Sequence, residues 1–374
     1  MIPRRASRQI RVKDFLIGGG APVSIQSMTK TDTTNIEETV RQIRALATAG
    51  CEIVRVAVPT IEAAKALPDI RREANKVPLV ADIHFHPQFA IAAIDAGFDK
   101  IRWNPGNIRD TKRVQEVVAR AKERRIPIRI GVNVGSLDPD CLPRQGRGGA
   151  ASSNDLVEAI VQSALKSVRL LEGFGFQDIV ISLKSSDVPQ TLAAYRRMAQ
   201  LCDYPFHLGV TEAGLLDAST VKSSIGIGAL LAEGIGDTIR VSITGDPIDE
   251  VKVAQRILSS LNLRRFETNV IACPSCGRCE IDVVGIAKQV QERLTALAAE
   301  EPRALELTVA VMGCVVNGPG ESEHADVGLA GGGGVGVIYR KGKQIRRVPE
   351  ADMVDALIEE VRRVLNESAA TVAT

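Results

Sequence analysis

The sequence lacks the features of a membrane or secreted protein. No apolar run approaches the roughly 20 residues that a membrane-spanning helix requires. The N-terminal segment 1–14 is basic but has no apolar stretch behind it, so it does not resemble a secretory signal. We therefore expect a cytoplasmic protein that does not associate with membranes.

A strong excess of charge of either sign is also absent. The 374 residues carry a formal net charge of +2, with 45% apolar and 25% charged residues. Nucleic acids and anionic membrane surfaces attract proteins whose basic residues gather on one face. The nearly balanced charge therefore argues against a nucleic-acid partner. The composition is that of a globular protein, and the length is sufficient for a large core.

Short apolar runs recur along the first two thirds of the chain and alternate with helix-length segments. They occupy residues 23–28, 53–58, 79–85, 100–106, 128–134, 178–184, 207–213 and 238–244. Eight strands that alternate with amphipathic helices predict a parallel sheet in an α/β protein, and this number favours a closed (β/α)8 barrel of the TIM type. A doubly wound open sheet is the alternative. No G-x-G-x-x-G motif follows the first run, which argues against a dinucleotide-binding version.

Three other segments of the barrel region carry predictions. Residues 8–17 alternate between apolar and polar types, which fits a small hairpin at the bottom of the barrel. Residues 135–155, rich in Gly, Pro and Ser, follow the fifth strand and predict either a mobile lid or a disordered loop. Residues 223–234 predict a glycine-rich helix start between strands seven and eight, where barrels often bind phosphate.

A second, smaller domain is predicted after residue 264. Residues 265–374 contain, in order, a strand, a cysteine turn, a helix, a strand, a second cysteine turn, a glycine-rich segment, a hairpin and a last helix. We therefore divide the chain into a barrel domain that binds the substrate, residues 1–264, and an α+β domain that carries the cysteines, residues 265–374.

Four of the seven cysteines lie between positions 273 and 314. Reduced thiols clustered in this way in a cytoplasmic protein indicate metal binding rather than disulfides. Cys273 and Cys276 have the C-x-x-C spacing that holds a metal centre from one turn, and Cys314 comes from a second turn. Zinc and iron–sulfur clusters both use such spacings. Spacing alone favours an iron–sulfur cluster over zinc or unligated thiols, and would make Cys279 the fourth ligand.

Polar side chains stand at or near the carboxyl end of nearly every expected strand, and in a (β/α)8 barrel these ends converge on one mouth. Four arginines and a lysine with few acids favour a multiply charged anion, and the planar guanidinium suits phosphate oxygens. A single arginine here would more often be a salt-bridge partner, but the repetition over seven strands favours a diphosphate site. The residues are Arg55, Asp82, His84, Arg102, Asn104, Arg129, Asn133, Lys184, Thr211, Glu212, Arg240 and Ser242.

The motifs resemble, in the same order along almost the whole chain, those of the bacterial 4-hydroxy-3-methylbut-2-enyl diphosphate synthases of the non-mevalonate (MEP) isoprenoid pathway. They include VADIHFHP at 80–87, KIRWNPGN at 100–107, CPSCGR at 273–278 and GCVVNGPGE at 313–321. The last two together are highly specific. The resemblance implies an iron–sulfur oxidoreductase with a barrel and a cluster domain, without the inserted domain of plant members.

The resemblance also implies a set of cluster ligands. A [4Fe–4S] cluster would be held by Cys273, Cys276, Cys314 and Glu321, with the glutamate on the iron from which the substrate's oxygen displaces it. Cys279 stands where the family commonly has other residues, so we do not expect it to be a ligand. An alternative in which its thiol binds a resting or damaged cluster stays open.

The implied substrate is 2-C-methyl-D-erythritol 2,4-cyclodiphosphate, which is opened reductively to the linear allylic diphosphate with two electrons from flavodoxin or ferredoxin. Glu212, with Asp82 and His84 nearby, would be the proton donor. Bacterial relatives of this form make a head-to-tail homodimer in which one chain's cluster covers the other's barrel mouth. The phosphates would be held by Arg55, His84, Arg102, Asn104, Arg129, Asn133, Lys184, Arg240 and Ser242, with Thr211 beside them.

Two other classes of protein share some of these features. A pterin or phosphate-ester transferase would have the same anion-binding barrel with a structural zinc domain, and would need no low-potential electrons. A binding module that docks a partner through the cysteine turn would not explain the charged residues of the barrel mouth.

Overall fold

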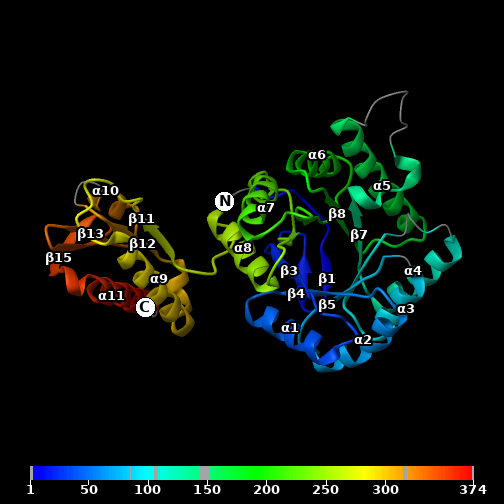
Figure 1. The fold of residues 1–374 in the computed structure, drawn as a ribbon, viewed down its shortest axis with the longest axis horizontal. Helices are drawn as coiled ribbons and strands as arrows, with labels where there is room; N and C mark the ends of the chain where they lie inside the picture. The colour runs from blue at the N-terminus through cyan, green and yellow to red at the C-terminus, as the bar shows by residue number, and fades with distance from the viewer. Residues whose placement is uncertain are drawn as a thin grey trace. The chain divides into compact units, whose positions relative to one another are not determined.

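The computed structural model describes residues 3–84, 86–104, 108, 110–142, 152–314 and 318–372. The chain divides into two compact units, Met1–Arg264 and Arg265–Thr374, and each is described by itself (Figure 1). In the described part of the chain, no helix combines the length and the apolar character needed to span a bilayer. The centre of the expected lid, 143–151, lies outside the described residues.

The first unit is a (β/α)8 barrel, which confirms the predicted fold class. Its strands are hydrogen-bonded in the order β8-β7-β6-β5-β4-β3-β10-β9, and a bridge between Ile181 and Phe206 joins the two ends, so the open-sheet alternative is excluded. The strands are β3 (Ser24–Met28), β4 (Ile53–Ala57), β5 (Leu79–Asp82), β6 (Lys100–Trp103), β7 (Ile128–Asn133), β8 (Ile179–Lys184), β9 (His207–Leu208) and β10 (Thr238–Ile239).

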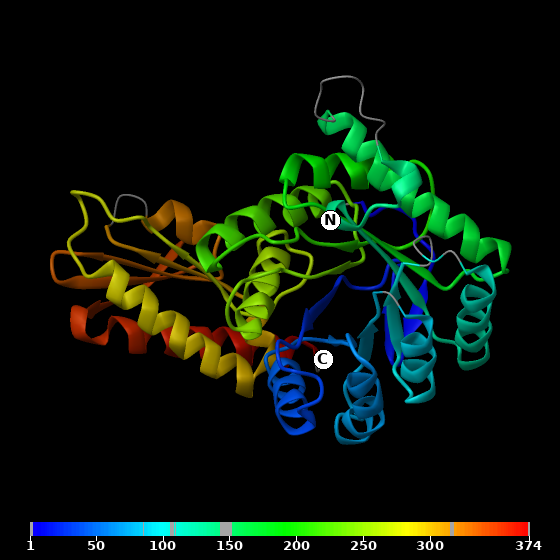
Figure 2. The ribbon, with the colours of Figure 1, turned by 45° about the vertical axis from the view of Figure 1, so that its right-hand side comes forward.

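Helices surround these strands (Figures 1 and 2). Their apolar residues recur at three- and four-residue spacing, so that α1 buries Val40, Ile43 and Leu46 against the barrel. Most begin at a polar cap, as α2 does at Thr60, whose side chain accepts from the Ala63 amide. The helices are α1 (Ile36–Thr48), α2 (Ile61–Glu73), α3 (Pro87–Asp95), α4 (Thr111–Arg124), α5 (Ser153–Gly173), α6 (Val188–Ala199), α7 (Leu216–Ala232) and α8 (Pro247–Ser260).

The predicted N-terminal hairpin is present. Strands β1 (Ile10–Val12) and β2 (Phe15–Ile17) pair antiparallel. Val12 and Ile17 are fully buried against Ile53 and Val80, which lie near the amino ends of β4 and β5. The hairpin therefore packs at the end of the barrel opposite the carboxyl ends of the strands.

The prediction of a helix start within residues 223–234 was wrong. Helix α7 begins at Leu216, so the glycines of this segment lie inside the helix. A Cβ atom on Gly226 would stand 2.6 Å from the Val210 side chain. The glycine therefore lets α7 pack closely on the barrel, and the segment provides no helix N-terminus for a phosphate.

The second unit is an α+β domain with a five-stranded sheet in the order β11-β12-β13-β14-β15. Strands β11, β12 and β13 run parallel to one another, and β14 runs antiparallel to both of its neighbours, β13 and β15. The strands are β11 (Asn269–Ala272), β12 (Thr308–Met312), β13 (Val327–Gly332), β14 (Val335–Arg340) and β15 (Lys343–Pro349), and the helices are α9 (Val283–Glu300), α10 (Gly318–Glu323) and α11 (Met353–Val372). The sequence did not predict α10 or β13.

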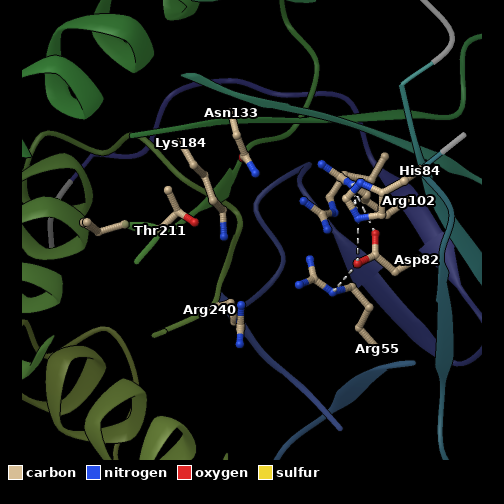
Figure 3. A pocket seen from close by; sticks show the side chains of 10 residues that line it. Arg55, Asp82, His84, Arg102, Asn133, Lys184, Thr211 and Arg240 are labelled. Carbon is tan, nitrogen blue, oxygen red and sulfur yellow. Dashed lines mark hydrogen bonds and ion pairs between the residues drawn. The ribbon is translucent and has the colours of Figure 1, made fainter. Parts of the chain in front are cut away.

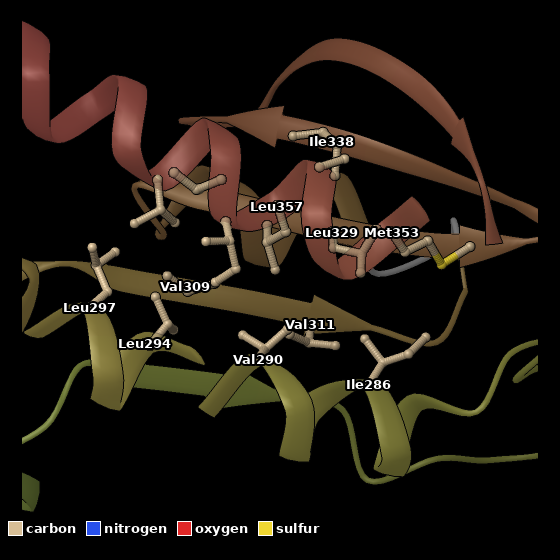
Figure 4. Packing of buried hydrophobic residues seen from close by; sticks show 14 of the residues in the cluster. Ile286, Val290, Leu294, Leu297, Val309, Val311, Leu329, Ile338, Met353 and Leu357 are labelled. Carbon is tan, nitrogen blue, oxygen red and sulfur yellow. The ribbon is translucent and has the colours of Figure 1, made fainter. Parts of the chain in front are cut away.

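One face of this sheet carries the core of the second unit. Val290 and Leu294 of α9 and Leu357 of α11 pack together with Val309 and Val311 of β12, and all five are fully buried (Figure 4). Burial of these side chains fixes β12 against the two helices, because each contributes roughly 1.5–3 kcal/mol relative to exposure. The carboxyl ends of β11 and β12, where the cysteines follow, are thereby held in place.

Candidate functional site

The mouth of the barrel is a cavity lined almost entirely by polar side chains. Every polar residue that lines it belongs to the set predicted from the strand ends. Figure 3 shows Lys184 and Arg240 projecting toward the same space as Arg55, Asp82 and Arg102. The lining consists of Arg55, Asp82, His84, Arg102, Arg129, Asn133, Lys184, Val210, Thr211 and Arg240.

Three predicted residues do not line this cavity. Asn104 is buried, and its Oδ1 accepts from Ser167 Oγ at 3.0 Å. Ser242 is half-buried, and its carbonyl accepts from Ser219 Oγ at 2.7 Å. Glu212 is exposed, with a φ of 52°, in the left-handed region that few residues other than glycine adopt. The roles expected of these three residues stay predictions.

Asp82 organises the cations on one side of the mouth. Its Oδ1 accepts from Arg102 Nη1 at 3.2 Å, and its Oδ2 lies 3.6 Å from Arg55 Nε and 3.5 Å from His84 Nε2. Burial opposes ionisation, but the charges of Arg55 and Arg102 and the hydrogen bond from His84 keep the pKa of Asp82 well below its ordinary value. The carboxylate is therefore charged at neutral pH.

The positive charge of the mouth exceeds what this carboxylate can balance. Burial lowers the pKa of Lys184 strongly, and the nearby charges of Arg129 and Arg240 lower it further. Burial also lowers the pKa of Arg55 to about 10, although Asp82 opposes the shift. Within the described residues, the ion pairs of Asp82 join it to Arg55, His84 and Arg102, and not to Lys184 or Arg129.

The guanidinium of Arg129 has N–H donors that are available to bind an anion in the mouth. Its Nη1 donates to Ser182 Oγ at 2.7 Å, whereas Nε and Nη2 are buried and have no hydrogen-bond partner in the described part of the chain. Buried donors are normally satisfied. An anion with several oxygens would satisfy these donors and relieve the repulsion among the cations.

Sequence reasoning missed Glu250, which stands behind the mouth on α8. Its Oε1 accepts from Arg240 Nη2 at 3.0 Å and from the Ile243 amide at 3.1 Å, and its Oε2 accepts from Ser27 Oγ at 2.8 Å. The carboxylate is fully buried and fixes the orientation of the Arg240 guanidinium. One signal was available, since Glu250 falls on the apolar face of an amphipathic helix.

A second cavity lies in the α+β unit and brings four cysteines together. Cys273 follows β11 and Cys314 follows β12, and these strands are parallel neighbours, so their carboxyl ends meet. The Gly313 amide donates to Cys273 Sγ at 3.2 Å. The lining consists of Cys273, Pro274, Ser275, Cys276, Arg278, Cys279, Met312, Gly313 and Cys314.

The chemistry of these thiols suits an iron–sulfur cluster. The backbone N–H of Arg278, together with its side chain, lowers the pKa of Cys276 and so favours the thiolate that binds metals. Within the described ranges, no three His, Cys, Asp or Glu side chains converge on a single ion. Thiolates are ligands of both zinc and iron–sulfur clusters.

Glu321, the fourth predicted ligand, belongs to α10 and is exposed. It does not belong to the lining of the cysteine cavity. The structure therefore brings Cys273, Cys276 and Cys314 together with Cys279, and its arrangement leaves the role of Glu321 a prediction.

The fold and the two sites define a class of protein, a (β/α)8 barrel with a cation-lined mouth joined to an α+β domain with a cysteine-lined cavity. Family models match both units: the GcpE TIM-barrel domain matches residues 7–255, and the GcpE protein C-terminal domain matches residues 269–363. The chain belongs to the GcpE family.

Two relatives resemble the chain over nearly its full length. The protein from Geobacter sulfurreducens is 54% identical over 361 residues, with 96% of this chain and 98% of the relative covered. The protein from Symbiobacterium thermophilum is 52% identical over 363 residues, with 97% and 94% covered. Both are named 4-hydroxy-3-methylbut-2-en-1-yl diphosphate synthase (flavodoxin).

Among solved structures, a dihydropteroate synthase from Stenotrophomonas maltophilia is similar to the barrel. It has a TM-score of 0.50 at 15% sequence identity, and the match covers 68% of this chain and 98% of that one. At this level of identity the similarity shows the barrel fold alone.

Asp82→Asn should remove part of the acid sensitivity of the protein. The pKa of Asp82 is depressed in the folded state, so its stabilising effect is complete above the unfolded pKa of about 3.9 and is lost below it, at about 1.4 kcal/mol per pH unit. Urea denaturation between pH 5 and pH 2.5 should show that the free energy of unfolding falls less steeply with decreasing pH in the variant. The difference in slope should correspond to the uptake of one proton fewer on unfolding. At pH 7 the variant should be less stable by about 3–5 kcal/mol, because Arg55 and Arg102 lose their counter-charge.

Asp95→Asn is the matched control. Asp95 pairs with Arg120 on the surface, with 42% of its side chain exposed, and its loss should change the free energy of unfolding by at most about 1 kcal/mol. An unchanged pH dependence in Asp82→Asn would contradict the buried ion-pair assignment.

Proposed function

We propose that this protein converts 2-C-methyl-D-erythritol 2,4-cyclodiphosphate to (E)-4-hydroxy-3-methylbut-2-enyl diphosphate in the MEP isoprenoid pathway. The conversion consumes two electrons and two protons and releases water. The observation that carries the proposal is the buried, cation-rich mouth in a chain of the GcpE family. A cyclic diphosphate carries the negative charge that balances these cations and several oxygens that accept their hydrogen bonds.

The barrel side chains have separate roles in this proposal. Lys184, Arg129 and Arg240 neutralise the diphosphate, and Arg55 and Arg102, held by Asp82, contact it from the other side. When the ring opens, negative charge develops on a diphosphate oxygen, and preorganised guanidinium groups stabilise it without reorganisation. His84, Asn133 and Thr211 add hydrogen bonds that orient the substrate.

Cys273, Cys276 and Cys314 would hold a [4Fe–4S] cluster, with Glu321 as a further ligand. Such a cluster, when bound, supplies electrons one at a time at low potential. The Gly313 amide, which donates to Cys273 Sγ, would stabilise the thiolate charge. Flavodoxin, which the names of the relatives include, is the proposed electron donor.

Glu212 is the proposed proton donor for the oxygen that leaves as water. It follows Thr211, which lines the mouth, and its left-handed backbone is a conformation that costs roughly 1–3 kcal/mol and is often retained at functional sites. In this proposal the exposed carboxyl turns toward the bound substrate.

We further propose a cytoplasmic head-to-tail homodimer, because the cluster and the substrate must meet although they are held by separate compact units of the chain. In this arrangement the α+β unit of one chain would serve the barrel of its partner.

The first experiment is anaerobic reconstitution followed by metal analysis and turnover. The wild-type protein should hold about four irons and four sulfides per chain, absorb visible light and turn over the cyclic diphosphate with reduced flavodoxin. Cys314→Ala should lose the cluster, and Cys202→Ser, a change in the barrel, should keep it. A colourless protein with one zinc would contradict the proposal and favour a transferase, and full iron content in Cys314→Ala would contradict that ligand.

Arg102→Ala should impair turnover without affecting iron content. Arg102 is buried and donates hydrogen bonds to Asp82 and to the Gly131 carbonyl. Loss of its charge should raise the activation free energy that kcat/KM measures by about 2–5 kcal/mol, which lowers kcat/KM by a factor of about 30 or more. Steady-state kinetics at several substrate concentrations measure this change. Arg120→Ala, a surface change, should retain the wild-type kcat/KM. A wild-type kcat/KM in Arg102→Ala would remove this residue from the site.

The shared-site dimer can be tested with the same two variants. The Cys314→Ala chain and the Arg102→Ala chain are given different affinity tags and co-expressed. The dimer that carries both tags is then isolated. It contains one intact barrel facing one intact cluster domain, so it should recover about half of the wild-type activity per dimer. A doubly tagged dimer as inactive as the two parent variants would contradict a site shared between chains.

A further inference from the structure

Cys279 is the cysteine of the α+β unit to which the proposed function gives no role. It completes a C-x-x-C-x-x-C sequence with Cys273 and Cys276, a spacing that also holds [4Fe–4S] clusters in bacterial ferredoxins. Its backbone N–H donates to the Cys276 carbonyl at 2.9 Å, which closes a tight turn. The turn brings Cys279 back to the cavity that the other three cysteines line.

The position of the Cys279 thiol is defined by Gly313. A Cβ atom on Gly313 would lie 2.4 Å from Cys279 Sγ and 3.3 Å from Cys273 Sγ. Both sulfur atoms therefore occupy the same side of Gly313, next to Cys314 in sequence. The Glu280 amide donates to the Gly313 carbonyl at 3.2 Å, so the segment after Cys279 is tied to the end of β12. This contact holds the thiol at the cavity.

The Cys279 thiol makes one weak hydrogen bond, which would be lost if its sulfur bound iron. It donates to the Ile281 carbonyl at 3.2 Å, and the side chain is half-buried. Thiol donors are weak, so exchanging this hydrogen bond for a bond to iron costs little. Soft thiolates suit iron–sulfur clusters better than hard carboxylates do.

Glu321 differs from Cys279 in each of these respects. It is exposed, lies on the short helix α10 and does not belong to the lining of the cavity. Cys279 therefore stands at the wall of the cysteine cavity, whereas Glu321 does not line it.

We propose that Cys279 is a second ligand for the fourth iron of the cluster, exchangeable with Glu321. The inference rests on the proposed function, because it presupposes a [4Fe–4S] cluster on Cys273, Cys276 and Cys314. When Cys279 binds, its thiol proton goes to solvent and the Glu321 carboxylate is released; no electron is transferred. The fourth iron thus keeps a protein ligand when the glutamate is absent.

The test measures how firmly the fourth iron is held. Wild type, Cys279→Ser, Glu321→Ala and the double variant are reconstituted anaerobically in buffer free of thiols and imidazole. Each is treated with a mild one-electron oxidant, and formation of a three-iron cluster is followed by electron paramagnetic resonance together with iron analysis. These readouts do not depend on turnover.

Each single variant should lose the fourth iron slowly, because the other side chain holds it. The double variant should lose it at least about tenfold faster, which corresponds to about 1.4 kcal/mol. The matched control combines Glu321→Ala with Cys202→Ser, a half-buried cysteine of the barrel, and should behave as Glu321→Ala alone.

One outcome would overturn the inference: the double variant would lose iron no faster than Glu321→Ala. That outcome leaves the proposed function intact, because the wild-type cluster is still present. A wild-type protein that holds no iron and sulfide after reconstitution would instead overturn the proposed function.

Discussion

The removal of several positive charges from water at one end of the barrel is the constraint on which the rest of the site depends. Arg55, Arg102, Arg129, Lys184 and Arg240 line a cavity in which Asp82 is the carboxylate among the described lining residues. Such burial is costly unless the charges are paired. The rigid barrel sustains this cost because seven of its eight strands, all except β3, supply one or two of the side chains, and helices with apolar faces hold the strands in register. An anion with several oxygens completes the charge balance.

Much of the fold and of this mouth could be predicted from the sequence, because both follow from strand topology. Apolar runs of strand length gave the eight strands, and the carboxyl ends of parallel strands in a barrel face one opening, so Asp82 and Arg102 were expected there. The four clustered cysteines were likewise expected to lie close together, and they line one cavity. These predictions need only the order of elements along the chain, which local sequence patterns specify.

Other features depend on contacts between segments that are distant in the sequence. The position of Glu250 on the apolar face of α8 indicates its burial, but its partner Arg240 follows only from the fold. Glu212 has a left-handed backbone and does not belong to the cavity lining, which its position after a strand did not predict. Strand β13 is rich in glycine, and the sequence analysis described it only as a glycine-rich segment. A Cβ atom on Gly328 would lie 2.1 Å from Ser322 Oγ, so glycine is required there for α10 to approach the sheet.

The hairpin β1–β2 has a consequence for the traffic of molecules through the barrel. Because Val12 and Ile17 fill the end beneath Ile53 and Val80, a molecule at the mouth has no passage through the barrel axis. Entry and exit then share a single doorway. In the proposed function, a diphosphate product would leave by the path along which the next cyclic diphosphate arrives, and both would compete for the same guanidinium groups. The affinity for the substrate must therefore be high enough to remove its water, and the affinity for the product low enough for it to dissociate before the next substrate binds.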